Sequence, residues 1–420
     1  PDVLSPDVLS PDVLSPDVLS PDVLSPDTFD PCASCGVLGC HPSGTRCHRF
    51  QASNVDQTTL SQAWPSASAA CVISAAGEIN GETGLLGACR VAGSEGQALA
   101  GVYWKRISQA GSSQKVGLFV VDSLVINAGV TLRGKGNVPI IIVARQAITV
   151  AGTLDIGAEQ HATGPGGGSG GFSDGDDASS CRGGGGGGGD KNSVDEGGGG
   201  GGGWGGAGAV GGYGWNTPGG SAGAKTVANS KTPLTPLLGG CGGGAGGGSS
   251  DRGGRGGGGG GAVQLSAMSV TVSGAVHAAG GGGDGGQYGR AGGGGGSGGS
   301  IFMEAVTLII SGSLTANGGG GGAGSSGSTQ SQAADGDDGG WTRSAAPGGK
   351  QSGANGGDGG DGGAFQLAPT PGTKGDYNGG GGGGGVGVIH ALVPTSVVPT
   401  VSGALVSPEG TYADVSFNVW

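Results

Sequence analysis

Short runs of apolar, β-branched residues recur through the middle of the chain, separated by glycine and polar residues. The first group lies in residues 118–132, 140–144 and 148–154. β-Branched residues favour strands, and glycines between short apolar runs are typical of turns. Ala128-Gly129 recurs as Ala151-Gly152, 23 residues later. A short repeat with turn residues at fixed offsets is typical of a stack of β-coils.

A second pair of apolar units repeats at a longer distance. Residues 263–276 align without a gap with residues 301–314, at a spacing of 38. Side chains alternate between the two faces of a strand. The alignment therefore predicts that two pairs of residues face a common interior, Val263 with Ile301 and Leu265 with Met303.

Two weaker copies of the same unit follow at residues 365–368 and 386–391. Together the units predict a mainly β fold with little or no α-helix. We expect β-solenoid coils that are interrupted by glycine-rich insertions of the polyglycine II type.

Glycine supplies 110 of the 420 residues. Pure glycine runs lie between the β-units, and no strict Gly-X-Y period runs through the chain, which excludes collagen. Polyglycine packs as threefold helices whose amides bond to neighbouring helices, and only glycine fits at that distance. Flexible loops are the alternative, because ordering glycine costs the most entropy. Such pure runs are residues 183–189, 197–203, 256–261, 318–322 and 379–385.

Composition divides the chain into four parts. Residues 1–25 are five copies of Pro-Asp-Val-Leu-Ser, and proline at every fifth position predicts an extended spacer over residues 1–27. Residues 28–115 form a cysteine-rich cap segment, residues 116–405 the glycine-rich solenoid, and residues 406–420 a C-terminal strand or tail. Because the chain starts with Pro1, we expect a processed or partial sequence.

The chain has eight cysteines, and we predict that all of them form disulfides in an oxidising compartment. Eight cysteines allow 105 connectivities. The pair that we predict first is Cys181–Cys241, which would close the long glycine excursion. Zinc binding by the first four cysteines and their histidines is the alternative. The eight are Cys32, Cys35, Cys40, Cys47, Cys71, Cys89, Cys181 and Cys241.

Charge and motifs exclude several function classes. The net charge is −12 and the basic residues form no stripe, so we expect no nucleic-acid partner. No apolar run is long enough to predict a transmembrane segment. The Gly-x-Ser-x-Gly match around Ser169 has glycine on both sides instead of a strand and a helix. We therefore predict no catalytic residues, no resident metal or cofactor and no enzyme activity.

Aromatic and acidic residues within the glycine tracts are the candidate binding groups. Aspartates in the strings at 174–177 and 335–338 offer oxygen ligands for calcium, with solvated turns as the alternative. His277 and His390 are expected on the surface. Aromatic rings can stack on sugars or on another surface, or can cap the glycine layer. The candidate surface-binding residues are Trp204, Tyr213, Trp215, Tyr288, Trp341 and Tyr377.

Residues 299–322 carry a family resemblance. They read Gly-Ser-Ile-x-Met-x-Ala, then Leu-Ile-Ile-Ser-Gly-Ser-Leu-Thr-Ala-Asn, then a glycine run. This pattern resembles the glycine-rich surface proteins of myxobacteria and related bacteria, over residues 116–405. The glycine tracts are loosely similar to polyglycine-sandwich regions of phage adhesins and insect antifreeze proteins. The resemblance implies a secreted or cell-surface location.

The sequence therefore leads us to expect an extracellular structural or adhesive protein, with a fibre or filament subunit as one form of it. Binding of a ligand, glycan or ice by a flat glycine lattice is the alternative function. The candidate partners are a second copy of the chain, through the N-terminal arm, and a surface glycan.

Overall fold

The computed structural model describes residues 52–63, 70–97, 101–172, 175–178, 181, 185–190, 195–226, 234–248, 253–326, 332–351, 353–394, 397–409 and 411–414. The chain divides into two compact units, residues 1–49 with Trp420 and residues 50–419. All described residues belong to the second unit. The predicted spacer, residues 1–27, lies outside the described residues.

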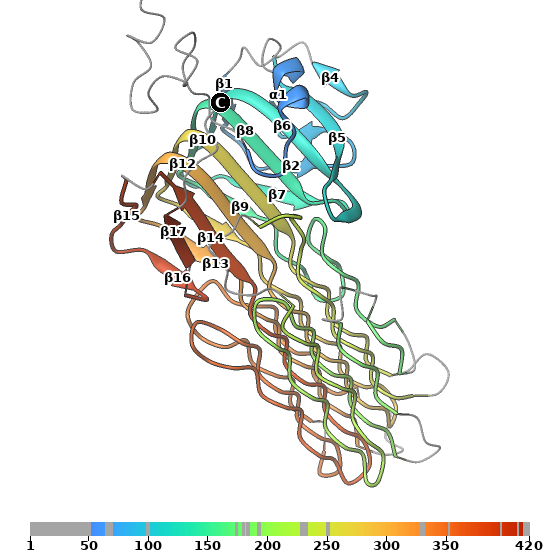
Figure 1. The fold of residues 1–420 in the computed structure, drawn as a ribbon. Helices are drawn as coiled ribbons and strands as arrows, with labels where there is room; N and C mark the ends of the chain where they lie inside the picture. Colours follow the sequence, from blue (N-terminus) through green and yellow to red (C-terminus); the bar gives the residue numbers. More distant parts are fainter. Residues whose placement is uncertain are drawn as a thin grey trace, which may run out of the picture. The chain divides into compact units, whose positions relative to one another are not determined.

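The larger of two sheets contains ten strands among the described residues, and parallel pairs form most of it (Figure 1). The antiparallel hairpin of β5 and β6 closes one end. Across the sheet the order is β17 (Thr411–Asp414), β14 (Val388–Val393), β12 (Ser300–Ile310), β10 (Ala262–Val272), β8 (Ile140–Val150), β6 (Ser112–Ile126), β5 (Tyr103–Gln109) and β4 (Gly96–Gln97), with β1 (Ala70–Ile73) paired to β6 and β15 (Thr400–Val401) to β12.

The second sheet has seven strands in the described part and lies opposite the first. Its strands follow those of the first sheet along the chain, so that β8 leads to β9 and β10 to β11. Its order is β16 (Leu405–Ser407), β13 (Ser313–Thr315), β11 (Ala275–His277), β9 (Thr153–Asp155), β7 (Thr131–Lys135), β2 (Gly77–Asn80) and β3 (Leu85–Leu86). The fold is thus mainly β, and α1 (Gln57–Ala63) is the one helix of the described residues.

The predicted register at a spacing of 38 is confirmed. In the parallel pairing of β10 with β12, Val263 lies beside Ile301 and Leu265 beside Met303. All four side chains are fully buried in the core between the two sheets. The weaker unit at 386–391 is also a strand, because β14 continues the same register beside β12.

The corners between the sheets require glycine. A β-carbon at Gly274 would overlap the carbonyl oxygen of Gly152 in the preceding corner. A β-carbon at Gly312 would in the same way overlap the carbonyl oxygen of Gly274. The repeated Ser-Gly pair of the sequence therefore marks stacked corners at which one backbone approaches the next.

Two features differ from the expectations. Residues 365–368 are not a strand; they form a turn in which Phe365 has a φ of 47°, closed by a bridge between Ala364 and Leu367. The turn is short and apolar, and for that reason it resembles a strand in sequence. The sheets also continue across residue 116, which lies inside β6, because β1 and β2 pair with β6 and β7.

A buried carboxylate anchors residues 52–63 on the outer face of the larger sheet. Glu304 of β12 is fully buried and accepts hydrogen bonds from the amide and hydroxyl of Ser53, from Ser266 at 2.9 Å and from Gln264 at 2.7 Å. Burial raises the pKa of the Glu304 carboxyl, and these hydrogen bonds lower it in part. Nothing in the local sequence distinguishes this glutamate from a solvated one.

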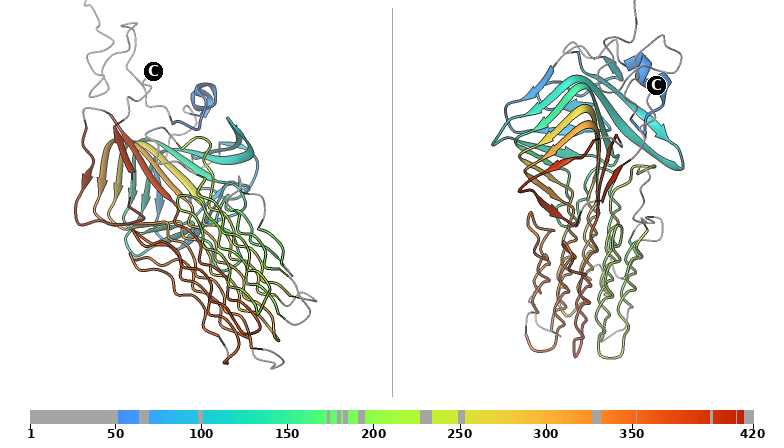
Figure 2. Two further views of the ribbon diagram at one scale, coloured as in Figure 1. Left: turned by 60° about the horizontal axis from the view of Figure 1, so that its bottom comes forward. Right: turned by 60° about the vertical axis from the view of Figure 1, so that its left-hand side comes forward.

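Glycine-rich segments run side by side beyond one end of the sheets (Figure 2). β10, β12 and β14 each begin where a glycine segment ends. We call this body the glycine bundle; it comprises the described residues of 157–261, 278–299 and 316–387. It has almost no strand, and its amides bond to carbonyls of distant segments.

The hydrogen bonds of the bundle have a period of three residues. In the run 197–203, amides three residues apart donate to the same neighbouring segment. One such neighbour runs antiparallel to the run and a second runs parallel to it. The donor–acceptor pairs are Gly198–Gly212 and Gly201–Ala209 for the first neighbour, and Gly199–Gly292 and Gly202–Gly295 for the second, at 2.8–2.9 Å. A hydrogen-bond repeat of three residues, with all bonds leaving the run, is the pattern expected for threefold extended helices.

Close approach explains why these runs are pure glycine. β-Carbons at Gly198, Gly200 and Gly201 would overlap carbonyl oxygens of three different residues. The run 197–203 is therefore enclosed, and every residue in it is buried. Its hydrogen-bonded neighbours are residues 187–190, 209–212, 220–223, 244–247, 292–295 and 382–385.

Candidate functional site

Five of the six candidate aromatic residues have exposed side chains. Their exposed fractions are 54% for Tyr213, 53% for Trp215, 47% for Tyr288, 43% for Trp341 and 42% for Tyr377. Exposed aromatic rings are costly to leave in water, and a group of them is typical of a binding surface.

Four of these rings lie at the same end of the glycine bundle. β12 and β14 start at residues 300 and 388, directly after glycine segments, so the turns that precede those segments are far from the sheets. Tyr288 and Tyr377 lie in these turns. The turn at Trp204 lies beside the start of β12, at the end of the bundle next to the sheets. The chain then runs away from the sheets to its next turn, which contains Tyr213 and Trp215, so this turn also lies at the far end. We call this the aromatic end of the bundle.

Backbone and side-chain contacts tie two of the turns together. The amide of Gly375 donates to the carbonyl of Tyr213 at 3.0 Å. The ammonium of Lys374 lies 5.5 Å from the ring centre of Trp215, within reach of a cation–π interaction. The turn at 213–217 is thereby held beside the segment that leads to Tyr377.

An ion pair between a buried glutamate and a partly exposed arginine holds the remaining turns. Glu196 is fully buried, and its Oε1 accepts a bond of 2.7 Å from the guanidinium of Arg290. Its amide donates to the carbonyl of Tyr377 at 3.2 Å. On the other side, the hydroxyl of Ser325 accepts from the amides of Gly289 and Arg290, both at 2.8 Å. The residues beside Tyr288 and Tyr377 therefore occupy defined positions.

Trp341 lies at the opposite end, against the second sheet. Its ring stacks on His277 of β11, with ring centres 3.7 Å apart. His277 is 5% exposed and shares a 2.6 Å hydrogen bond with Thr315. Burial lowers the pKa of His277 to about 4, although Asp155 acts in the opposite direction. The expectation of a surface position was wrong for His277, and also for His390, which is 2% exposed.

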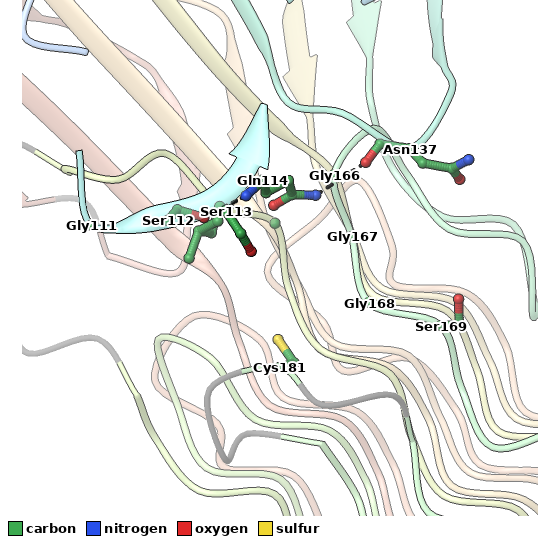
Figure 3. A pocket seen from close by; sticks show the side chains of 12 residues that line it. Gly111, Ser112, Ser113, Gln114, Asn137, Gly166, Gly167, Gly168, Ser169 and Cys181 are labelled. Carbon is green, nitrogen blue, oxygen red and sulfur yellow. Dashed lines mark hydrogen bonds between the residues drawn. The ribbon is translucent and has the colours of Figure 1, made fainter. Parts of the chain in front are cut away.

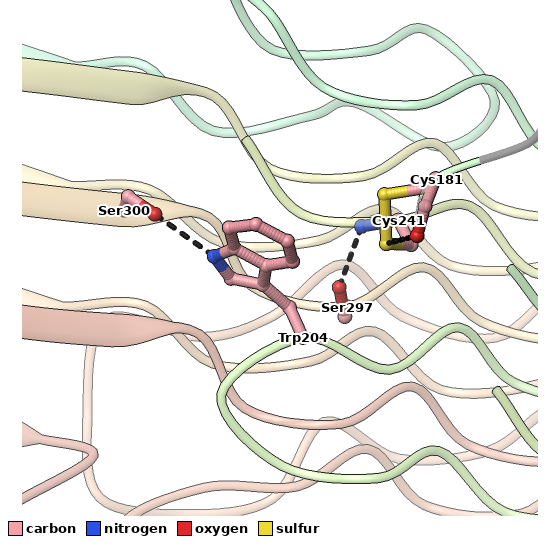
Figure 4. The surroundings of a disulfide bond; sticks show 5 residues. All are labelled: Cys181, Trp204, Cys241, Ser297 and Ser300. Carbon is pink, nitrogen blue, oxygen red and sulfur yellow. Dashed lines mark hydrogen bonds between the residues drawn. A yellow bond between two sulfur atoms is a disulfide. The ribbon is translucent and has the colours of Figure 1, made fainter. Parts of the chain in front are cut away.

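Trp204 is a correction to the predicted surface. It is 4% exposed, and its indole Nε1 donates to the hydroxyl of Ser300 at 2.9 Å (Figure 4). The ring packs where a glycine turn meets β12. The local sequence of a tryptophan between two glycine segments thus does not show whether its ring is exposed or packed.

The predicted disulfide Cys181–Cys241 is confirmed (Figure 4). The amide of Cys241 also donates to the hydroxyl of Ser297 at 2.8 Å. Cys71 pairs with Cys89, and no described cysteine is free. The remaining four cysteines, Cys32, Cys35, Cys40 and Cys47, lie outside the described residues, together with the zinc alternative.

The aspartates of the acidic strings bond to bundle amides. Oδ1 of Asp338 accepts from Gln160 and Gly282 at 2.7 and 2.8 Å, and Oδ1 of Asp335 accepts from Gly285 at 2.7 Å. Within the part of the chain that the structure describes, no His, Cys, Asp and Glu side chains are grouped as a metal site would need. At the rim of the bundle, these carboxylates accept hydrogen bonds from amides, as the carbonyls of neighbouring segments do in the interior.

A cavity of about 590 Å³ opens between the hairpin of β5 and β6 and the bundle (Figure 3). Residues 111–114, Asn137, residues 166–169, Cys181 and residues 238–239 line it. Among the described residues the lining offers hydroxyl, amide and backbone groups, and Cys181 is in a disulfide.

No described helix is both long and apolar enough to cross a bilayer. No protein-family model matches this chain. Searches of curated proteins and of solved structures also find no match. The assignment of a function therefore depends on the molecule's own geometry.

Proposed function

We propose that the protein is an extracellular structural or adhesive protein without catalytic activity, in which the glycine bundle carries a binding surface. In this proposal the paired sheets are coils of a β-solenoid whose insertions form a polyglycine II lattice. The observation that carries it is the aromatic end, where four exposed rings lie in turns that an ion pair and backbone hydrogen bonds hold in place.

The disulfides support the extracellular location. Cys71–Cys89 and Cys181–Cys241 are formed, and such bonds persist in oxidising compartments and are rare in the cytosol.

The chemistry of the aromatic end favours a glycan as ligand. Tyrosine and tryptophan offer a flat apolar face together with a hydrogen-bonding group. The C–H faces of sugar rings pack on such rings, while the sugar hydroxyls reach polar groups at the edge. Lys374 beside Trp215 adds a cation to the surface.

Binding to an array of immobilised glycans tests the proposal. We expect the wild-type protein to bind a defined set of saccharides, and the double variant Trp215→Ala/Tyr377→Ala to lose most of that binding. Leu367→Ala is the matched control, because Leu367 is 53% exposed in the turn whose Phe365 amide bonds to Ser407 of the second sheet. Equal binding by the double variant and the control would refute the assignment of this surface.

A further inference from the structure

A second period of three residues marks the surface of the glycine bundle. Interior runs such as 197–203 and 379–385 are glycine throughout, and all their residues are buried. In the two neighbouring surface segments, every third residue carries an exposed side chain. These residues are Ala207, Val210 and Tyr213 in the segment 206–213, and Pro218, Ser221 and Ala224 in the segment 218–224.

The same pattern recurs on other sides of the bundle. Each of three further segments has a non-glycine residue at every third position, exposed or half-exposed. The residues are Gln332, Asp335 and Asp338; then Ser344, Pro347 and Lys350; then Asn355, Asp358 and Asp361.

The geometry of the interior shows what these rows do. In a threefold helix every third residue faces the same direction. Along the interior run, Gly198 and Gly201 face one neighbour so closely that a β-carbon on either would overlap a carbonyl oxygen, of Gly380 and Gly383 respectively. Neighbouring helices thus pack along lines that are mostly glycine, with a buried alanine such as Ala209 or Ala245 in places. A row with a side chain at every third position, several of them larger than a methyl group, does not offer such a line.

Surface backbone groups of such a bundle resemble those of an exposed edge strand. An edge strand offers unpaired amides and carbonyls to other chains, and proteins protect it with charged residues and proline. The rows in the bundle contain proline, lysine and aspartate at the corresponding positions. Some aspartates also occupy the place of a neighbour directly, as Asp361 does by accepting from the amide of Gly348 at 2.9 Å.

We propose that these rows of side chains terminate the bundle and prevent it from adding the glycine segments of a second copy of the chain. The sides of the bundle are then closed to the addition of further glycine segments. This inference is independent of the ligand proposed for the aromatic end.

The test removes one protective surface. In the variant with Ala207, Val210, Tyr213, Pro218, Ser221 and Ala224 all changed to glycine, two adjacent segments present only glycine at their outward positions. We expect its mass in sedimentation velocity to rise with concentration, at least twofold, whereas the wild-type protein keeps the mass of one copy. The control keeps side chains at the first row, as Ala207→Ser/Val210→Thr/Tyr213→Ser, and should behave like the wild type.

Amide exchange of residues 197–203 shows whether the glycine variant remains folded. If it does not, Ser344→Gly/Pro347→Gly/Lys350→Gly applies the same test on another side. A folded glycine variant that stays a single copy overturns the proposal, and so does a wild-type protein that associates through the segment 206–213. Loss of order in both glycine variants overturns it as well, because the rows would then hold their own segments in place.

Discussion

The paired sheets and the glycine bundle are continuous in the chain, yet they bury different groups. Between the sheets lie large apolar side chains such as Ile301, Leu308 and Phe119, all almost fully buried. In the bundle the buried material is mainly backbone, hydrogen-bonded between segments that are far apart in sequence.

The comparison shows which region depends on the other. Each buried apolar side chain contributes about 1.5–3 kcal/mol. Ordering a residue costs about 1–2 kcal/mol, most for glycine, while a backbone hydrogen bond contributes a net of about 0.5–1.5 kcal/mol. The bundle is therefore near balance by itself. We expect it to need the sheets, which hold one end of its segments in register, and the disulfide, which closes part of it.

The strongest test of this dependence is Ile301→Asp. It places an unpaired charge in the core, and we expect a loss of about 4 kcal/mol or more, with both regions losing order. Ile309→Asp is the control, because Ile309 lies on the same strand but is 37% exposed. Circular dichroism and amide exchange measure the outcome. If the run 197–203 remained protected in the Ile301 variant, the bundle would not depend on the sheets.

Removing the disulfide in the bundle should have the next largest effect. Cys181 and Cys241 are 60 residues apart, and closing such a loop contributes about 4 kcal/mol in the chain-entropy model. We expect the double alanine variant to lower the melting temperature and to speed exchange in the bundle first. The matched comparison is the disulfide Cys71–Cys89, whose cysteines are 18 residues apart. Closing that loop contributes about 3 kcal/mol in the same model, and its removal should affect the sheets. Unchanged exchange in the bundle of the first variant would contradict this view.

A single methyl group should then disturb the bundle alone. A β-carbon at Gly382 would overlap the carbonyl oxygen of Ala209, so we expect Gly382→Ala to cost about 2–3 kcal/mol. Ser221→Thr also adds a methyl group but on an exposed residue, and should change stability by less than about 0.5 kcal/mol. Amide exchange should rise around residue 382 and stay constant in β10 and β12. Equal behaviour of both variants would show that the bundle tolerates side chains.

The smallest expected effect is a pH dependence in the sheets. Burial lowers the pKa of His277 from 6.5 to about 4, so the unfolded chain binds the proton more readily. The contribution of His277 is complete above pH 6.5 and is lost as the pH falls towards 4, by about 2 kcal/mol at pH 5. His277→Gln should lack this part of the pH dependence of unfolding. Parallel curves for the variant and the wild type would contradict the assignment.

Several features of the fold followed from the sequence because they depend on short-range pattern. The alternation in residues 263–276 and 301–314 predicted both the strands and the register of β10 on β12. The pure glycine runs left threefold helices and flexible loops as alternatives, and the hydrogen bonds of the run 197–203 repeat every three residues. The sequence also contains segments with a non-glycine residue at every third position, as in Asp358-Gly-Gly-Asp361. This pattern identifies surface segments once the bundle is known.

The tertiary structure alone decided which residues meet. Trp204 and Tyr213 both lie among glycines, but one turn faces the sheets and the other the far end, so one ring is buried and the other exposed. Glu304 looks like a surface residue in its strand, and is buried because residues 52–63 cover it. The sequence by itself determined the main strands and the glycine corners, since these depend on neighbours along the chain, but it did not separate the turn at 365–368 from a strand. It could not determine the aromatic end, because glycine has no side chain to record which segments pack together.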